Sequence, residues 1–143
     1  MGRILVIYDD PESERTVRRI LESAGYDVIA APCCGPSAMD VFHNTNPGLV
    51  VLDVCLPRKS GQDLCRQIRG NSESVPLLVL SAVRDVADVI LLLELGADGY
   101  MTKPFSPWEF LARVRAVMRT RRLVKIKIAE GLEGKPVRAE ESG

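Results

Sequence analysis

The stretch Leu49-Val50-Val51-Leu52-Asp53 places four large apolar residues directly before a carboxylate. An apolar run without polar alternation is typical of a strand that is covered on both faces, as the strands of parallel sheets are. In open sheets of this kind, ligands bind beyond the carboxyl ends of the strands, which is where Asp53 stands. This stretch therefore predicts both the fold class and the position of a site.

Four further apolar segments lie on either side of this stretch, and amphipathic segments alternate with them. Strands that alternate with helices require right-handed crossovers. We therefore predict a doubly wound α/β fold, with a five-stranded parallel sheet and helices on both faces. The predicted strands are residues 4–8, 27–30, 49–52, 76–80 and 98–101. The predicted helices are residues 11–24, 35–44, 62–69, 85–95 and 107–121.

Length and composition are those of one folded domain. The chain has 143 residues, of which 46% are hydrophobic and 27% are charged, and this balance is typical of a packed core. No apolar run approaches the roughly 18 residues of a membrane span, and the first residues lead into a strand without a signal peptide. We therefore expect a cytoplasmic protein without membrane contact. Four cysteines without Cys-x-x-Cys spacing and a single histidine, His43, argue against a zinc site or a disulfide scaffold.

The charges are distributed unevenly along the chain. Basic and acidic residues balance to a net charge of zero, yet residues 110–127 contain seven basic side chains and no acidic one. The preceding part of the chain is correspondingly acidic. An acidic body is a poor candidate for binding nucleic acid by itself.

The side chains that follow the predicted strands carry a specific chemistry. Because the carboxyl ends of parallel strands meet at one edge of the sheet, these side chains are expected to converge. Clustered carboxylates need a compensating cation, and aspartate oxygens suit Mg²⁺. A carboxylate beside a divalent ion and an ammonium group can act as the nucleophile in phosphoryl transfer and form an aspartyl phosphate. These residues are Asp9, Asp10, Asp53, Ser81 and Lys103.

Four motifs stand in order along the chain: Asp9-Asp10, residues 52–57 followed by Gly61, Ser81-Ala82, and residues 100–105. Together they resemble the receiver domain, or CheY-like domain, of two-component response regulators. The resemblance covers about residues 3–121, which leaves residues 122–143 as a linker or a C-terminal tail. It implies a flavodoxin-like sheet with the strand order 2-1-3-4-5.

The resemblance also implies roles for individual residues. Asp53 would accept a phosphoryl group from a sensor histidine kinase in a phosphorelay, and Lys103 and Ser81 would contact that group. Asp9 and Asp10 would form an acidic metal pocket with Asp53. Asp10 would bind Mg²⁺, or Mn²⁺, directly, together with the backbone carbonyl of Cys55. Such a domain is not an enzyme in the ordinary sense, because it catalyses only its own phosphorylation and dephosphorylation.

Activation in this family moves the serine and an aromatic residue, here Ser81 and Tyr100, together. The movement would alter the face built by residues 85–95, 98–101 and 107–121. Taken alone, Tyr100 is also compatible with a simple core aromatic. The Lys103-Pro104 peptide bond is usually cis in this family.

The last predicted helix resembles the OmpR/PhoB subgroup, whose members regulate transcription through a winged-helix DNA-binding domain. That domain is absent from this chain, so DNA contact is expected only through such a C-terminal domain. Members of the subgroup form a homodimer through the face defined above. Here Val89 and Gly99 stand where the subgroup usually has charged residues, so an apolar interface or a different dimer is expected.

Other interpretations stay open at this stage. An atypical receiver would act through protein–protein interaction without phosphorylation, but the full set of site residues argues against it. An aspartate-nucleophile phosphatase would need a second acid where this chain has Cys55, and a flavodoxin-type cofactor site conflicts with the charge of Asp9-Asp10. Taken alone, this acidic pair is also compatible with a helix cap before Pro11. The alternating segment 124–128 is compatible with a strand or with an extension of the last helix.

Overall fold

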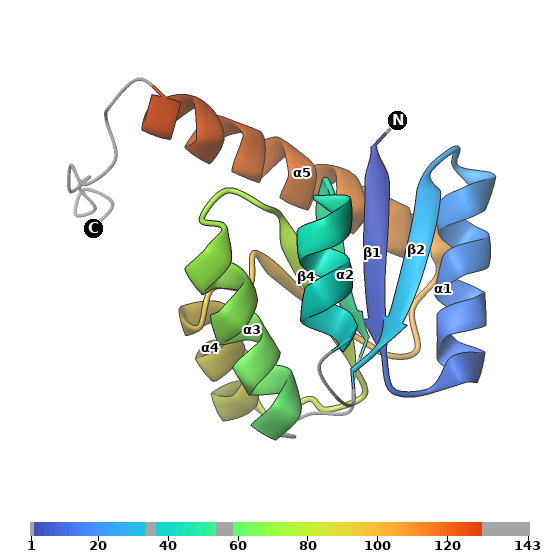
Figure 1. The fold of residues 1–143 in the computed structure, drawn as a ribbon. Helices are drawn as coiled ribbons and strands as arrows, with labels where there is room; N and C mark the ends of the chain where they lie inside the picture. Colours follow the sequence, from blue (N-terminus) through green and yellow to red (C-terminus); the bar gives the residue numbers. More distant parts are fainter. Residues whose placement is uncertain (1, 34–36, 54–58, 130–143) are drawn as a thin grey trace.

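Five parallel strands form one sheet at the centre of the computed structural model, which describes residues 2–33, 37–53 and 59–129 (Figure 1). The strand order is β2-β1-β3-β4-β5, so the expected order 2-1-3-4-5 is confirmed. Each strand lies where an apolar run predicts one. The strands are β1 (Arg3–Tyr8), β2 (Asp27–Pro32), β3 (Leu49–Asp53), β4 (Leu77–Ser81) and β5 (Gly99–Thr102).

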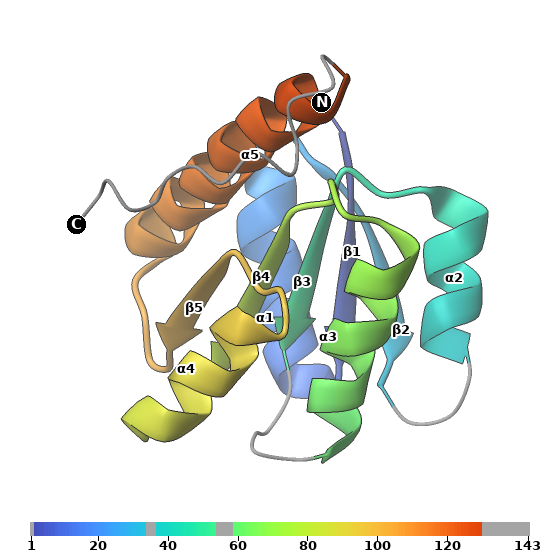
Figure 2. The ribbon, with the colours of Figure 1, turned by 90° about the vertical axis from the view of Figure 1, so that its left-hand side faces the viewer.

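Helices cover both faces of the sheet and enclose two apolar cores (Figures 1 and 2). One core contains buried residues of α1 and α5, and the other contains buried residues of α2, α3 and α4. Both cores share the sheet, whose central strands β3 and β4 are buried along their whole length. The helices are α1 (Pro11–Ser23), α2 (Ser37–Thr45), α3 (Lys59–Asn71), α4 (Val86–Glu94) and α5 (Pro107–Ala129).

The last helix is longer than the sequence pattern predicts. We expect it to end near Arg121, whereas α5 continues to Ala129 and includes the alternating segment 124–128. The physical reason is the absence of a stop signal, because no proline or glycine occurs between Pro107 and Gly131. Helix α3 similarly begins at Lys59 rather than at the predicted Gln62.

The register of the strands brings their carboxyl ends to one edge. Tyr8 of β1 pairs with Asp53 of β3, and Ser81 of β4 pairs with Thr102 of β5. Two backbone hydrogen bonds extend this alignment past the strand ends. The Asp9 amide donates to the Asp53 carbonyl at 3.3 Å, and the Lys103 amide donates to the Ser81 carbonyl at 2.9 Å. The predicted convergence of these segments is therefore confirmed.

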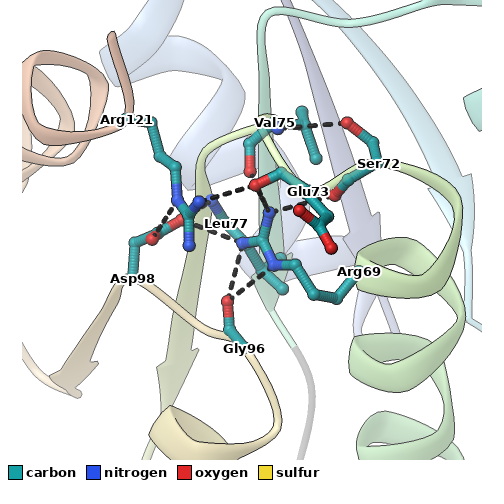
Figure 3. A network of polar contacts seen from close by, with 8 residues as sticks. All are labelled: Arg69, Ser72, Glu73, Val75, Leu77, Gly96, Asp98 and Arg121. Atoms are coloured by element: carbon teal, nitrogen blue, oxygen red, sulfur yellow. Dashed lines mark hydrogen bonds and ion pairs between the residues drawn. The ribbon is translucent and has the colours of Figure 1, made fainter. Parts of the chain in front are cut away.

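At the amino ends of the strands, opposite the carboxyl ends described above, the carboxylate of Asp98 contacts three elements (Figure 3). Its Oδ2 accepts from the Leu77 amide at 2.9 Å and lies 3.0 Å from Nη2 of Arg69. Its Oδ1 accepts from Nε of Arg121 in α5 at 2.5 Å. Arg121 also donates to the Glu73 carbonyl at 2.6 Å. This Arg69–Asp98–Arg121 cluster thus ties α3 and α5 to the amino ends of β4 and β5.

The guanidinium of Arg69 is the centre of this cluster (Figure 3). Burial lowers the pKa of Arg69, and the nearby charge of Arg121 lowers it further, while Asp98 raises it. Gly96 has a φ of +119°, and a Cβ there would lie 2.8 Å from the Arg69 side chain, so this position requires glycine. Backbone carbonyls satisfy the other Arg69 donors, at Gly96, Ser72, Glu73 and Val75.

The cysteines that the structure describes, Cys33 and Cys65, are buried and form no disulfide. Burial raises the pKa of Cys65 to about 11, which keeps its thiol protonated and unreactive at neutral pH. Cys34 and Cys55 lie outside the described residues. Within the described part of the chain, no helix has the length and apolar character to cross a membrane.

Candidate phosphoryl-transfer site

The Asp53 carboxylate at the end of β3 is fully buried, with 0% exposure, and it is held from two sides. Nζ of Lys103 lies 2.5 Å from Oδ1 in an ion pair. The hydroxyl of Ser13 donates to Oδ2 at 2.7 Å, and Lys103 Nζ donates to that hydroxyl at 2.8 Å. A buried carboxylate needs such partners, because its charge is costly to desolvate. The predicted approach of Asp53 and Lys103 is therefore present.

The backbone places the side chains of Lys103 and Ser13 next to Asp53 at the end of β3. Lys103 follows β5 directly, and the Lys103-Pro104 peptide bond is cis, as expected. Ser13 lies in the first turn of α1, which has Pro11 as its first residue and Asp10 as its N-cap. Proline suits the first helical position because its missing N–H would find no partner there. The start of α1 thus fixes where the Ser13 hydroxyl lies.

The two neighbouring aspartates occupy different environments. Asp9 is partly buried, and its backbone amide bonds to the Asp53 carbonyl. Asp10 is exposed, and its Oδ1 accepts from the Glu12 amide at 3.2 Å. Asp10 therefore caps α1, as the alternative interpretation of the acidic pair describes. Cys55, the fourth expected metal-binding residue, lies outside the described residues.

The residues at this edge provide oxygen donors for a hard divalent cation. Among the described residues, no three histidine, cysteine or acidic side chains are gathered as a ready metal cluster. However, Oδ1 of Asp53 is the one buried side-chain oxygen or nitrogen in the described part of the chain that lacks a hydrogen bond. The Lys103 ammonium balances the charge of this oxygen as an ion pair, but the contact does not have the geometry of a hydrogen bond. A buried carboxylate with unused acceptor capacity, whose backbone carbonyl bonds to the Asp9 amide, fits the oxygen ligands that Mg²⁺ prefers.

Ser81 and Tyr100 meet at the loop between β4 and α4. Ser81 is buried, and its hydroxyl accepts from the Val83 amide at 3.1 Å. The Tyr100 hydroxyl donates to the Val83 carbonyl. Burial raises the pKa of Tyr100, and a hydrogen bond with Ser81 partly offsets this rise. Both residues therefore contact Val83, which links the carboxyl edge of the sheet to the surface beside α4.

Ser13 is the site residue that sequence reasoning missed. It lies 40 positions from Asp53 in the chain and follows no strand directly. The sequence feature that could have indicated it is a serine in the first turn of a helix that directly follows the acidic pair Asp9-Asp10. That signal is weak, because serine at the start of a helix is common for reasons of capping alone.

The fold and this site define a doubly wound, CheY-like α/β domain with a buried aspartate and a lysine at the carboxyl edge of its sheet. The chain belongs to the response regulator receiver domain family, whose model matches residues 4–115. It is therefore a signalling domain of a two-component system and not an ordinary enzyme.

Individual relatives agree with this assignment. The chain is 48% identical over 119 residues to the probable transcriptional regulator ycf27 of Galdieria sulphuraria, covering 80% of this chain and 45% of that protein. It is 45% identical over 120 residues to the alkaline phosphatase synthesis transcriptional regulatory protein PhoP of Bacillus subtilis, covering 83% and 50%. The chain thus spans about half the length of these relatives.

A solved structure shows the same fold. The BeF3-activated N-terminal receiver domain of RstA from Klebsiella pneumoniae matches with a TM-score of 0.74 and 35% identity, over 82% of this chain and 98% of that one. A CheY-like receiver domain from Methanospirillum hungatei, at 22% identity and a TM-score of 0.76, supports the fold alone.

Proposed function

We propose that Asp53 accepts a phosphoryl group from a sensor histidine kinase in the cytoplasm, and that this controls a transcriptional output. The observation that carries the proposal is the state of Asp53: buried, paired with Lys103 at 2.5 Å, and with Oδ1 free of hydrogen bonds. In the reaction, a lone pair of Asp53 forms the new O–P bond. The bond from phosphorus to the donor breaks, and its electron pair leaves with the donor. Lys103 is placed to stabilise charge on the transferred group.

The acidic residues at this edge would hold Mg²⁺ or Mn²⁺, which supplies charge neutralisation on the phosphoryl oxygens. Asp53 and Asp9 are the favoured side-chain ligands, with the Cys55 backbone carbonyl as the ligand that the family resemblance adds. That resemblance assigns direct binding to Asp10. The capping bond from the Glu12 amide to Asp10 favours Asp9 for this role instead, with Asp10 contributing negative charge nearby.

Ser81 and Tyr100 would carry the change to the surface. A phosphoryl group on Asp53 adds negative charge at the sheet edge and gives the Ser81 hydroxyl a new acceptor. Drawing Ser81 toward it would disturb the bond from the Val83 amide to Ser81, and Val83 also accepts from Tyr100. This contact chain supports a switch that acts on the face of α4, β5 and α5.

Metal removal tests the proposed chemistry. We expect acetyl phosphate with Mg²⁺ to give a phosphorylated band on a phosphate-affinity gel, and EDTA to reduce it by about tenfold or more, because the carboxylates then repel the incoming phosphate. Asp9→Asn should raise the Mg²⁺ concentration needed by roughly tenfold. Asp10→Asn keeps the helix cap, since asparagine caps a helix as well as aspartate does, and it is expected to raise the Mg²⁺ concentration needed by less than Asp9→Asn does.

Each other outcome has a clear consequence. Labelling that persists in EDTA would contradict the metal proposal, and a larger effect of Asp10→Asn would return direct binding to Asp10. An unlabelled wild-type protein, tested with small donors and with a kinase, would favour a receiver that acts without phosphorylation.

The face of α4, β5 and α5 is the proposed interface with a second copy of this chain. Large apolar side chains are exposed on α4 at Val86 (69%), Ile90 (50%) and Leu93 (43%), and Trp108 of α5 is 81% exposed. These residues lie on the elements through which the related subgroup dimerises. An apolar contact here would replace the ion pairs that Val89 and Gly99 cannot make.

A single charge tests this interface. Ile90→Arg is expected to weaken self-association of the acetyl-phosphate-treated protein by about tenfold or more, because one fully buried aliphatic side chain contributes about 1.5–3 kcal/mol. Sedimentation equilibrium measures the effect. Asn44→Arg adds the same side chain at an exposed position of α2 and should associate like the wild type. Equal association of Ile90→Arg and wild type would exclude this face.

A further inference from the structure

We infer that Ser13 belongs to the phosphoryl-transfer chemistry and that its hydroxyl shortens the lifetime of the phosphoryl group on Asp53. This inference rests on the proposed function, because it assigns a role to a further residue of the same site. Ser13 contacts both charged groups of that site. Its Oγ lies 2.7 Å from Oδ2 of Asp53 and 2.8 Å from Nζ of Lys103.

The direction of these hydrogen bonds follows from the groups themselves. A lysine ammonium can only donate, and an ionised carboxylate can only accept. The Ser13 hydroxyl has one proton, so it accepts from Lys103 and gives that proton to Asp53. Donation from the ammonium polarises the hydroxyl and strengthens its bond to the carboxylate.

The two oxygens of Asp53 are therefore unequal. Oδ2 is engaged by Ser13, whereas Oδ1 is buried, ion-paired with Lys103 and without a hydrogen bond. The lone pairs of Oδ1 are the ones available for attack on phosphorus. When Oδ1 forms the O–P bond, Oδ2 becomes the carbonyl oxygen of a neutral acyl group, and it still faces the Ser13 hydroxyl.

This change alters the strength of the Ser13 bond. A hydroxyl donates more strongly to an ionised carboxylate than to a neutral carbonyl, by roughly a factor of two. During dephosphorylation, a water oxygen attacks phosphorus and the P–Oδ1 bond breaks. The electron pair of that bond returns to Asp53. One water proton stays on inorganic phosphate, and the other passes to phosphate or to solvent. Negative charge grows on Asp53 in the transition state, where Ser13 stabilises it.

The same bond has the opposite effect on phosphorylation. It stabilises the carboxylate that must act as the nucleophile, and it becomes weaker as the acyl phosphate forms. Removing the hydroxyl should therefore leave Asp53 able to accept a phosphoryl group while slowing the loss of that group. A purely structural role for Ser13 would impair both steps together.

Decay of the label tests the inference. The full chain is phosphorylated with acetyl phosphate and Mg²⁺, the donor is removed by desalting, and the remaining label is followed on a phosphate-affinity gel. We expect Ser13→Ala to lengthen the half-life roughly three- to tenfold, the range that one hydrogen bond spans. Ser13→Thr restores a hydroxyl and should decay like the wild type. Thr16→Ala is the matched control, because it removes an exposed hydroxyl from the same helix that bonds only to the Glu12 carbonyl at 3.3 Å.

The remaining outcomes overturn the inference. An unchanged or shorter half-life of the phosphorylated Ser13→Ala variant would contradict the inference. So would a Ser13→Ala variant that unfolds at the wild-type temperature but takes up no label, because the hydroxyl would then be needed for phosphoryl transfer itself. Should Ser13→Ala fail to fold, Ser13→Cys keeps the side-chain volume with only a weak donor and must show the same long half-life. An unlabelled wild type would instead overturn the proposed function.

Discussion

Asp53→Asn is expected to abolish labelling by acetyl phosphate, leaving no band above background on a phosphate-affinity gel. The neutral amide lacks the negatively charged oxygen that attacks phosphorus, so the new O–P bond cannot form. The amide has nearly the same shape as the carboxylate, and its oxygen can still accept from Ser13 or Lys103. The variant should therefore fold, which circular dichroism and thermal unfolding would verify.

The control for this variant is another carboxylate of the same type in a different environment. Asp63 lies in α3 and forms a partly exposed ion pair with Arg66 at 2.9 Å. Asp63→Asn makes the same chemical change away from the site and should be labelled like the wild type. Labelling that persists in Asp53→Asn at the wild-type level would show that another residue is the acceptor.

Asp98→Ala is expected to lower the free energy of unfolding by about 3–5 kcal/mol, the range for removing one partner of a buried ion pair. The side chain of Asp98 is only 8% exposed, and those of Arg69 and Arg121 are 15% and 18% exposed. Without Asp98, two guanidinium groups face each other without an anion between them. The Leu77 amide also loses its acceptor.

Urea-induced unfolding followed by circular dichroism measures this effect. Asp63→Ala removes a carboxylate from an exposed pair and is expected to cost less than about 1 kcal/mol. If both variants lose the same small amount, the Arg69–Asp98–Arg121 cluster contributes little to stability. The cluster lies at the amino ends of the strands, whereas Asp53 lies at a carboxyl end. Any Asp98→Ala protein that folds should therefore still be phosphorylated by acetyl phosphate.

The sequence was a good guide to the elements and a weaker one to their ends. Runs such as residues 49–52 identify buried strands because the pattern is local to each segment. The end of α5 was less predictable, since a helix stops where a breaking residue or lost packing stops it, and neither was visible at Arg121. The strand order followed from the family resemblance, because pairing between strands is not encoded in the periodicity of any one of them.

Site residues could be predicted where they follow strands directly. Asp53 and Lys103 could be predicted in this way because the carboxyl ends of parallel strands lie at the same end of the sheet. Ser13 escaped because its contact depends on how the first turn of α1 lies against β3. Asp98 and Arg69 are 29 positions apart, and their pairing likewise depends on packing between distant segments.

Helix α5 has a mechanical consequence that follows from its length. At about 1.5 Å per residue, its 23 residues give a rod of roughly 35 Å. Its side chains packed against the sheet are those of Phe110, Val114 and Val117, and Arg121 forms an ion pair with Asp98. Helix and sheet therefore move as one body up to Arg121. A tilt of only about 5° in such a rod displaces its far end by roughly 3 Å. Small rearrangements beside β5 would thus be amplified at Ala129, the last residue of α5.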